Sequence, residues 1–435
     1  MNSESLARSV IARLRSAGHQ AYLVGGCVRD LLLGCHPKDF DVSTDARPDR
    51  LMDLFPNSGR VGAHFGVVLV RDAFSQIEVA TFRSDHDYED GRRPGIVHFE
   101  RDPRQDVLRR DFTINGLMMD PDTGEVLDYV EGRADLERRV VRAIGDPVER
   151  FREDHLRMLR AIRFAARLGF TIDGPTFDAI RAQHELIHRV SAERIRDELV
   201  RILTEGGARR GFEMLDASGM LGDLLPEVAA MKGVEQPPEY HPEGDVWAHT
   251  LLLLEQMNEP TSTLALGALL HDVGKPPTFR VAERIRFDGH VEEGVHLAHS
   301  ILTRLRFSRD EMEQVEALVA NHMKFKDVHQ MRDSTLKRFL RTPGFAEHLE
   351  LHRLDCLSSN KRLENYELVK EKLGAITEEQ LKPPPLLSGA DLIAAGYEPG
   401  PQFTEMLRAV EDAQLDGRIH TAGEAMALVR EHWPA

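Results

Sequence analysis

The spacing of apolar residues changes along this 435-residue chain, and each spacing predicts a different kind of element. In residues 1–18 the apolar side chains recur every three or four positions, which predicts an amphipathic helix. Short apolar runs bounded by turn residues follow, as expected of strands in a mixed α/β unit. These runs predict strands at 21–26, 40–44, 65–72 and 76–83, and a helix at 49–56 that stops at Pro56.

Polar and turn-forming residues interrupt this pattern at three places. Segment 84–99 is polar and rich in turn residues, which predicts a mobile loop, and helical periodicity follows from about residue 105. Prolines and glycines without periodicity predict linkers at 231–245 and 378–389. We therefore expect an α+β protein with a small mixed β-sheet head (1–140), an all-α neck and body (141–234), a helical domain (235–375) and a helical tail (376–435).

Composition and charge mainly exclude classes of protein. With 41% hydrophobic and 29% charged residues, the chain has the balance of a soluble globular protein, and it lacks the ~18–20 consecutive apolar residues of a membrane span. The N-terminus has no apolar core of a signal peptide, and three irregularly spaced cysteines fit a reducing cytoplasm. A net charge of −16 argues against non-specific coating of nucleic acid, although arginines are dense at 138–170.

A glycine pair and an acidic pair lie close together near the N-terminus. Gly25 and Gly26 end the first predicted strand, and Asp39 and Asp41 alternate along the next one. Glycines let backbone N–H groups approach a triphosphate, and aspartates at i and i+2 on a strand share one face, where they can hold divalent cations. Glu78, between two apolar residues of a later strand, is the expected third carboxylate. The alternative for the aspartates alone is a pair of solvated acids beside a strand.

The stretch LVGGCVRDLLLGCHPKDFDVST resembles the signature of the class II tRNA nucleotidyltransferase and bacterial poly(A) polymerase family. Segments 109–120, 153–170 and 192–203 are similar to the ribose- and phosphate-contacting, base-selecting and buttressing motifs of that family. The resemblance implies a polymerase-β-like nucleotidyltransferase head in which Asp39 and Asp41 hold Mg²⁺ and Glu78 assists. It also implies that the nucleotide is bound by Gly25, Gly26, Arg29, Arg110, Asp111, Asn115, Asp154, Arg157, Arg160 and Arg163.

Asp154 and Arg157 have a physical interpretation of their own. Residues i and i+3 share one face of a helix, so this carboxylate and guanidinium are expected side by side. A carboxylate accepts from the N4 amine of cytosine while a guanidinium donates to O2 and N3, and adenine offers a similar donor and acceptor. Uracil and guanine would leave the carboxylate unpaired, which is costly. The alternative is an ordinary ion pair on a helix surface.

Histidines and aspartates recur between residues 249 and 355 in a second pattern. The segment HDVGK, with a histidine upstream and an aspartate downstream, resembles the HD phosphohydrolase superfamily. The resemblance implies hydrolysis of phosphomonoesters or 2′,3′-cyclic phosphates, with Lys275 neutralising a phosphoryl oxygen, and a degenerate HD fold that only binds RNA is the alternative. The expected donors to a divalent transition metal (Ni, Mn, Co, Fe or Zn) are His249, His271, Asp272 and Asp355, with His290 and His322 for a second metal or phosphate.

Together the motifs predict template-independent addition or repair of the 3′-terminal CCA of tRNA from CTP and ATP, with release of pyrophosphate. Segment 79–100 lacks the basic, aromatic stretch of poly(A) polymerases and is similar to the loop of tRNA-specific members that assists the switch from C to A, which favours full CCA addition over CC addition alone. Partial CC-adding or A-adding activity and poly(A) polymerase activity are the nearest alternatives. The alternatives from other classes are an HD hydrolase with an RNA-binding N-terminal module, and an RNA-binding protein that is not an enzyme. The expected partner is the acceptor end of tRNA, held by the arginine-bearing helices.

Overall fold

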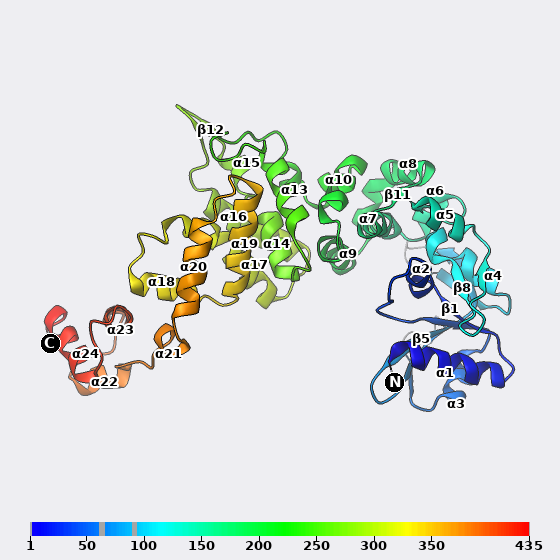
Figure 1. The fold of residues 1–435 in the computed structure, drawn as a ribbon, viewed down its shortest axis with the longest axis horizontal. Coiled ribbons are helices and arrows are strands. Elements are labelled where there is room, and N and C mark those ends of the chain that lie inside the picture. Colours follow the sequence, from blue (N-terminus) through cyan, green and yellow to red (C-terminus); the bar gives the residue numbers. More distant parts are fainter. Residues whose placement is uncertain (1, 61–65, 89–93, 435) are drawn as a thin grey trace. The chain divides into compact units, whose positions relative to one another are not determined.

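The computed structural model describes residues 2–60, 66–88 and 94–434. The chain divides into two compact units, Met1–Ala229 and Ala230–Ala435 (Figure 1). The first unit combines a β-sheet with helices, and the second is almost wholly helical, which confirms the predicted α+β class. Within the described ranges no helix is both long enough and apolar enough to cross a membrane.

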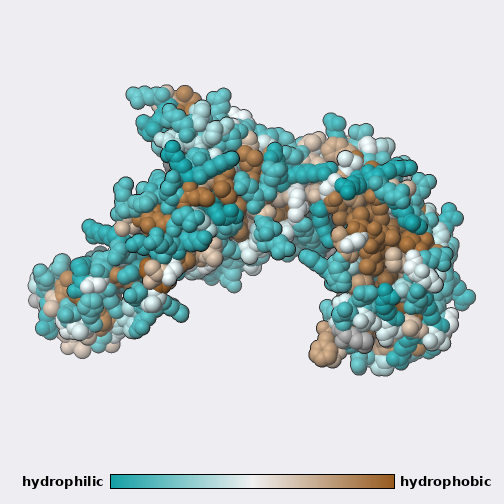
Figure 2. Space-filling model, viewed as in Figure 1, coloured by the Kyte–Doolittle hydropathy of each residue, from teal (hydrophilic) through white to brown (hydrophobic). Residues whose placement is uncertain are grey.

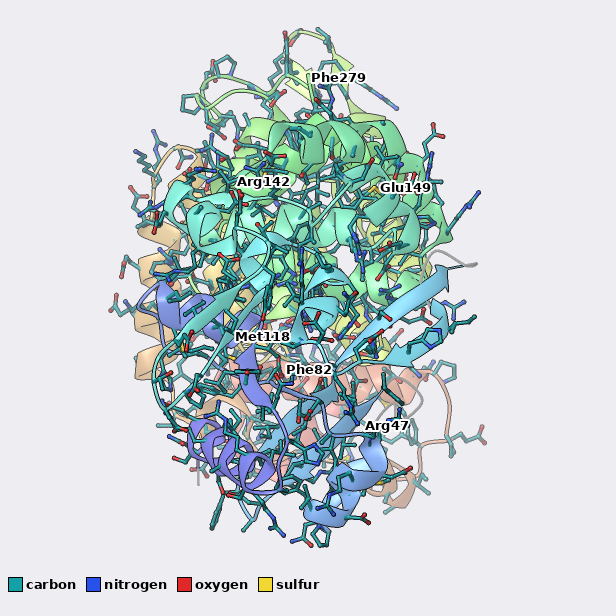
Figure 3. The ribbon with its side chains drawn as sticks, turned by 90° about the vertical axis from the view of Figure 1, so that its right-hand side faces the viewer. Arg47, Phe82, Met118, Arg142, Glu149 and Phe279 are labelled. Carbon is teal, nitrogen blue, oxygen red and sulfur yellow. The ribbon has the colours of Figure 1, made fainter. Side chains whose placement is uncertain are left out.

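The head of the first unit contains a seven-stranded mixed sheet with the strand order β3-β4-β5-β2-β1-β8-β9. At its centre β2 runs parallel to β5 and antiparallel to β1, so segments distant in sequence become neighbours. Phe82 and Met118 are fully buried in one apolar cluster inside the head (Figure 3). The strands are β1 (Ala21–Val24), β2 (Val42–Thr44), β3 (Ser58–Arg60), β4 (Val67–Arg71), β5 (Gln76–Thr81), β8 (Leu117–Met119) and β9 (Val126–Asp128).

Four helices accompany the head sheet. The predicted N-terminal helix is confirmed as α1 (Ser3–Ser16), whose apolar stripe is buried and whose first turn is capped by the Asn2 side chain. Proline opens two of the others, where its missing N–H removes no helical hydrogen bond. These helices are α2 (Gly26–Leu32), α3 (Pro48–Leu54) and α4 (Pro103–Leu108).

The prediction of a mobile loop at 84–99 is wrong, because the described part of this segment forms a β-hairpin. β6 (Arg83–Tyr88) pairs antiparallel with β7 (Pro94–Phe99). Main-chain hydrogen bonds can hold two antiparallel strands together without a regular apolar face. The polar composition of this segment therefore gave no sign of the hairpin. Arg109, which follows α4, lies 3.6 Å from the Asp85 carboxylate and connects the hairpin to the head. Residues 89–93 of the predicted loop lie outside the described residues.

The prediction of continuous helix after residue 105 is also wrong. β8 and β9 complete the head sheet, and a second break occurs where β10 (Val140–Val141) pairs parallel with β11 (Thr171–Ile172). Strands of two or three residues are too short for the spacing of their apolar residues to distinguish them from helix. The remaining elements of this unit are η2 (Thr113–Asn115), α5 (Gly132–Arg138), α6 (Pro147–Glu153), α7 (Arg157–Leu168), α8 (Gly174–Gln183), η3 (His184–Arg189), α9 (Ala192–Thr204), α10 (Ala208–Ser218), α11 (Met220–Leu224) and α12 (Pro226–Ala229).

The second unit is a helical body followed by a small helical tail. One projecting hairpin, formed by β12 (Arg280–Val281) and β13 (Ile285–Arg286), interrupts the helices. The body contains α13 (Val246–Gln256), α14 (Ser262–Leu270), α15 (Lys275–Thr278), α16 (His290–Arg304), α17 (Arg309–Asn321), η4 (His322–Asp327), α18 (Asp333–Leu340), α19 (Phe345–Ser358), α20 (Glu364–Ala375) and α21 (Glu378–Leu381).

The tail consists of α22 (Gly389–Ala394), α23 (Gln402–Leu415) and α24 (Ala422–His432). It has an apolar cluster of its own, centred on residues such as Leu392, Met406 and Val429. Arg338 of α18 donates to the Glu411 carboxylate of α23 at 3.2 Å, which attaches the tail to the body. The domain boundaries expected at residues 140, 234 and 375 stay a prediction.

Candidate nucleotidyl-transfer and metal sites

Three carboxylates lie together at the centre of the head sheet. Val42 of β2 lies opposite Val79 of the parallel strand β5, so Asp41 and Glu78, one residue earlier on each segment, are neighbours. Asp39 and Asp41 precede β2 rather than lying within it. Burial raises the pKa of Asp41 to about 6, helped by repulsion from Glu78 and Asp39 and opposed by Arg110. A bound cation would relieve this crowding, and carboxylates are the donors that Mg²⁺ prefers.

Gly25 forms the sharp connection between β1 and α2. Its φ of +77° is in the region that favours glycine, and an added Cβ would lie 3.2 Å from Nη1 of Arg110. Its own N–H already donates to the carbonyl of Leu117, at 3.1 Å. Gly25 therefore contributes a close approach of backbone to Arg110, and Gly26 begins the helix that follows.

Arg110 lies between the glycine turn and the carboxylates. Its Nη2 donates to Asp106 at 2.9 Å and to the Ser43 hydroxyl at 3.3 Å. Asp106 is fully buried and is also bound by Arg109, at 2.6 Å. Although burial alone would raise the pKa of Asp106, these two arginines lower it, so Asp106 stays ionised and orients Arg110.

The sequence predicted that Arg29 addresses the triphosphate, but the structure places its side chain in the interior. Arg29 is 2% exposed, and it donates to Asp30 at 2.8 Å and to the side-chain oxygen of Asn115 at 2.7 Å. Asn115 donates in turn to Asp111, at 3.2 Å. In this arrangement Arg29 orients Asn115, one of the residues expected to contact the sugar and phosphates.

Asp111 continues the same network to the helices of the neck. Arg160 of α7 donates to Oδ2 of Asp111 through two nitrogens, at 2.6 and 2.9 Å. Burial would raise the pKa of Asp111, but Arg160 lowers it to about 2. The contacts continue into a closed arginine–carboxylate ring, which runs through Asp30, Arg29, Asn115, Asp111, Arg160, Glu198, Arg163, Glu205 and Arg167 and returns to Asp30.

The arginine–carboxylate ring surrounds one aromatic side chain. The guanidinium groups of Arg29, Arg160 and Arg163 lie 5.2, 5.4 and 4.2 Å from the centre of the Phe164 ring. Arg163 is 4% exposed and donates to Glu198 of α9 at 2.6 Å. Such buried cations are held by carboxylates and by the aromatic face, so these contacts fix α7 and α9 against the head.

The expectation that Asp154 and Arg157 share one face of a helix is wrong. α6 ends at Glu153, Asp154 has extended backbone angles, and Arg157 is the first residue of α7. Oδ1 of Asp154 accepts from the N–H of Leu156, at 3.1 Å. Aspartates that bind nearby backbone N–H groups compete with helix continuation, which explains the break at this residue.

Each of these two side chains has its own partner. Arg157 is 9% exposed and donates to the Glu153 carboxylate at 2.6 Å and to the carbonyl oxygen of Arg109 at 3.1 Å. Asp154 accepts from Arg194 of α9, at 2.8 and 3.2 Å. Asp154 and Arg157 therefore do not form the i,i+3 ion pair that was the alternative interpretation. Sequence analysis missed Arg194, although it lies within the segment identified as the buttressing motif.

In the second unit, the predicted histidines and aspartates converge from five elements. His249 comes from α13, His271 and Asp272 follow α14, His290 begins α16, His322 begins η4 and Asp355 lies on α19. Their donor atoms form two groups, His249–His271–Asp355 and Asp272–His290–His322. One oxygen of Asp272 lies 3.1 Å from Nε2 of His271 and the other 3.7 Å from Nε2 of His322. Asp272 therefore lies between the groups and is suited to bridge two metal ions.

The imidazole rings in these two groups are oriented for metal binding. Nδ1 of His271, His290 and His322 lies 2.9, 2.8 and 2.6 Å from a backbone carbonyl, which selects the tautomer with a lone pair on Nε2. In the described part of the chain, Nε2 of His290 and Nε2 of His322 are buried and have no hydrogen-bond partner, while Nε2 of His271 faces the Asp272 carboxylate. Burial lowers the pKa of His322 to about 4, so its ring is neutral. Buried and unsatisfied nitrogen atoms of this kind fit a site for divalent transition metals.

His249 differs from the other rings because it lies between two carboxylates. Its Nε2 is 3.1 Å from Asp355, and its Nδ1 is 2.7 Å from Glu243. Burial alone would lower the pKa of His249, but Asp355 and Glu243 raise it to about 9. A metal cation on Nε2 would replace the proton held there, with Glu243 as the orienting partner behind the ring.

Glu243 was missed by sequence analysis because it lies in the segment 231–245, which was interpreted as a linker. Its side chain is only 6% exposed, and it also accepts from His241 at 2.8 Å. Lys275 is likewise placed differently from the prediction. Its ammonium is buried and donates to Asp272 at 2.6 Å and to Gln236 at 2.7 Å, so it orients the Asp272 carboxylate.

Three family models match the chain. A Poly A polymerase head domain matches residues 21–142, a probable RNA and SrmB- binding site of polymerase A matches 169–232, and an HD domain matches 244–355. The first contains the three carboxylates and the glycine turn, and the third contains both groups of metal donors. These matches confirm the resemblance inferred from the motifs.

Curated relatives and solved structures agree with the family models. A CCA-adding enzyme of Streptococcus pneumoniae is 30% identical over 430 residues, which cover 97% of this chain and 96% of that protein. One of Lactobacillus johnsonii is 38% identical over 258 residues, which cover 58% of this chain and 64% of that protein, slightly under two thirds of its length. The structure of a Bacillus stearothermophilus CCA-adding enzyme in complex with CTP superposes with a TM-score of 0.76 at 26% identity, covering 98% of this chain and 97% of that one. The chain therefore belongs to the CCA-adding enzyme and poly(A) polymerase family and carries an HD domain.

Proposed function

We propose that this protein adds or repairs the 3′-terminal CCA of tRNA, using CTP and ATP and releasing pyrophosphate. The observation that carries the proposal is the convergence of Asp39, Asp41 and Glu78 beside Arg110. The base-selecting residues, Asp154 and Arg157, belong to the same unit. Relatives named as CCA-adding enzymes, one of them solved with CTP, support the proposal.

In this proposal the three carboxylates hold two Mg²⁺ ions, which would activate the attacking 3′-hydroxyl and neutralise the triphosphate. Arg110, already close to the glycine turn, neutralises phosphate oxygens that approach Gly25. Asp111 and Asn115 contact the sugar. Their positions are held by Arg160 and Arg29, so both meet the nucleotide in a preset orientation.

Base choice falls to Asp154 and Arg157 at the α6–α7 junction. The carboxylate accepts from the exocyclic amine of cytosine or adenine, and the guanidinium donates to ring acceptors. Glu153 holds Arg157 and Arg194 holds Asp154, so neither group has to be ordered by the incoming base. Uracil and guanine present a carbonyl to the carboxylate and are rejected.

The test uses tRNAs that end at the discriminator base, at C or at CC, each incubated with CTP or ATP separately. We expect C to be added to the first two and A only to the last. Addition of A without prior C, arrest after CC, or long A tails would identify A-adding, CC-adding or poly(A) polymerase activity instead. The double variant Asp39→Ala/Asp41→Ala should lose nucleotide addition, and addition that survives it would refute the metal assignment.

We infer a second activity, metal-dependent phosphohydrolysis, from the two groups of donors that share Asp272. Divalent transition metals bound there would polarise a phosphate and activate water. In the net reaction, water oxygen bonds to phosphorus, the ester P–O bond breaks, and the leaving ribose oxygen takes up a proton. Burial alone would raise the pKa of Asp272, but His271 and the Lys275 ammonium hold it well below the usual range, so Lys275 helps to keep Asp272 ionised and in place.

This activity is tested by hydrolysis of a nucleoside 2′,3′-cyclic phosphate and a 3′-monophosphate after chelation and re-addition of Mn²⁺, Co²⁺, Ni²⁺, Fe²⁺ or Zn²⁺. We expect hydrolysis to require a metal and to be unaffected by Asp39→Ala/Asp41→Ala. Absence of hydrolysis with every metal would instead support an HD fold that only binds RNA.

A further inference from the structure

The projecting hairpin of the second unit carries an unusual charge arrangement. β12 and β13 pair antiparallel, with Arg280 directly opposite Arg286 and Val281 opposite Ile285. The hairpin extends beyond the helices of its own unit in Figure 1, and Figure 3 marks Phe279 at its base. Its surface is mostly hydrophilic with a small apolar patch among the polar atoms (Figure 2). Val281 is 72% exposed, so this hairpin is not held by an apolar core of its own.

Like charges placed directly across an antiparallel pair are destabilising unless an anion lies between them. Arg280 and Arg286 are both exposed, and no carboxylate lies within ion-pair distance of either one in the described part of the chain. The exposed acids Glu283, in the turn, and Asp288, just after β13, do not pair with these arginines. The two guanidinium groups are therefore available to bind an external anion with oxygen acceptors, such as a phosphodiester.

The base of the hairpin contacts the metal-donor groups through aromatic rings. Phe279 and Phe287 lie one position before and after the arginine pair, with ring centres 5.9 Å apart. Phe287 lies 5.4 Å from the ammonium of Lys275 and 6.5 Å from the ring of His290. Phe279 is itself 37% exposed. An exposed aromatic ring next to unpaired arginines is the combination that binds single-stranded nucleic acid, by base stacking and by phosphate contacts.

We propose that this hairpin binds the sugar–phosphate backbone of a single-stranded RNA whose terminal phosphate enters the HD site. The inference rests on the proposed phosphohydrolase and specifies its substrate as a polynucleotide end rather than a free nucleotide. Arg280 and Arg286 bind phosphodiesters upstream of the end, and Phe279 stacks on a base. Lys275 and His290 mark the point where the hairpin meets the metal donors.

The test compares two substrates of the full-length metal-loaded protein, a single-stranded RNA 10-mer with a 3′-phosphate and the corresponding nucleoside 3′-monophosphate. For Arg280→Ala/Arg286→Ala we expect kcat/KM on the 10-mer to fall roughly tenfold or more at low salt, while kcat/KM on the mononucleotide changes less than about twofold. Losing two phosphate contacts should also reduce the slope of log kcat/KM against log salt by about 1.4. Arg430→Ala, an exposed arginine of the tail helix α24, is the matched control and should match the wild type on both substrates.

Equal losses on both substrates, or no loss on the 10-mer, would overturn the inference. A second measurement tests RNA binding by the hairpin even if the HD domain has no hydrolase activity. A 10-mer with a photoreactive nucleotide placed upstream of the 3′ end is crosslinked to the wild-type protein, and the crosslinked peptides are identified by mass spectrometry. Crosslinks within residues 278–290 that disappear in the double arginine variant support the binding role even if no hydrolysis occurs, and crosslinks confined to other segments refute it.

Discussion

Arg194 of α9 donates to both carboxylate oxygens of Asp154, at 2.8 and 3.2 Å. The contact links the buttressing helix α9 directly to the residue proposed to accept from the base. Glu198 on the same helix holds Arg163 of α7, at 2.6 Å. α9 therefore supports the junction between α6 and α7 through ion pairs on both sides of Arg157 in the sequence, to Asp154 before it and to Arg160 and Arg163 after it.

We expect Arg194→Ala to impair base selection more than folding, because Asp154 loses the partner that orients its carboxylate. The kcat/KM for CTP should fall about tenfold, equivalent to ~1.4 kcal/mol, and discrimination against UTP should fall with it. Single-nucleotide incorporation with CTP, ATP, UTP and GTP measures both effects. Arg196→Ala on the same helix is the control, because Arg196 pairs with Asp197 instead. Equal losses with CTP and UTP would show a purely structural role.

Asp41→Asn should separate activity from stability. Folding raises the pKa of Asp41 to about 6, so the folded protein binds more protons than the unfolded chain between about pH 4 and 6. The contribution of this carboxylate to folding therefore becomes less favourable as the pH rises through that range. In a chelator at pH 8, Asp41→Asn should melt a few degrees higher than the wild type, and the difference should vanish near pH 4.

Thermal unfolding at both pH values, together with nucleotide addition, measures the effect of Asp41→Asn. Addition should be lost, and Mg²⁺, which we expect to raise the melting temperature of the wild type, should no longer raise that of the variant. Asp49→Asn, an exposed acid in the first turn of α3, is the control and should retain addition. A variant that melts below the wild type in chelator at pH 8 would contradict the repulsion described for Asp41.

Glu243→Gln should weaken metal binding without removing a metal ligand. The carboxylate behind Nδ1 of His249 makes the ring a better donor, and loss of such a partner commonly lowers metal affinity 10–100-fold. The metal concentration for half-maximal hydrolysis should rise by that factor, while hydrolysis at saturating metal stays close to the wild-type rate. Glu239→Gln, an exposed glutamate of the same segment, should leave the metal titration unchanged. A loss of rate that excess metal does not restore would argue against a positioning role.

Asp272→Ala should affect both metal positions, because the carboxylate lies between the two donor groups. His322→Ala should affect only the group that contains His290. Metal content by mass spectrometry is expected to fall further for the first variant than for the second, and nucleotide addition should stay intact in both. His299→Ala, whose exposed ring bonds Glu316, is the control. Equal metal loss in the two variants would contradict a bridging role for Asp272.

Local sequence patterns were sufficient to identify most of the candidate site residues. The order of Gly25-Gly26, Asp39-x-Asp41 and Glu78 identified the head, and the spacing of His271-Asp272 with its flanking donors identified the HD domain. The fold class and the family followed from these motifs, and both are confirmed. The residues of each motif lie at fixed spacings in the sequence because the strands and turns that carry them are short.

Only the tertiary structure decided which partner each group has. Sequence spacing placed Asp154 and Arg157 on one face of a helix, but the helix breaks between them and their partners are Arg194 and Glu153. Likewise Arg29 proved to be buried against Asn115, and Glu243 emerged from a presumed linker to orient His249. A buried charge must find a counter-charge wherever the packed elements place one, and that choice depends on which distant segments meet in the fold.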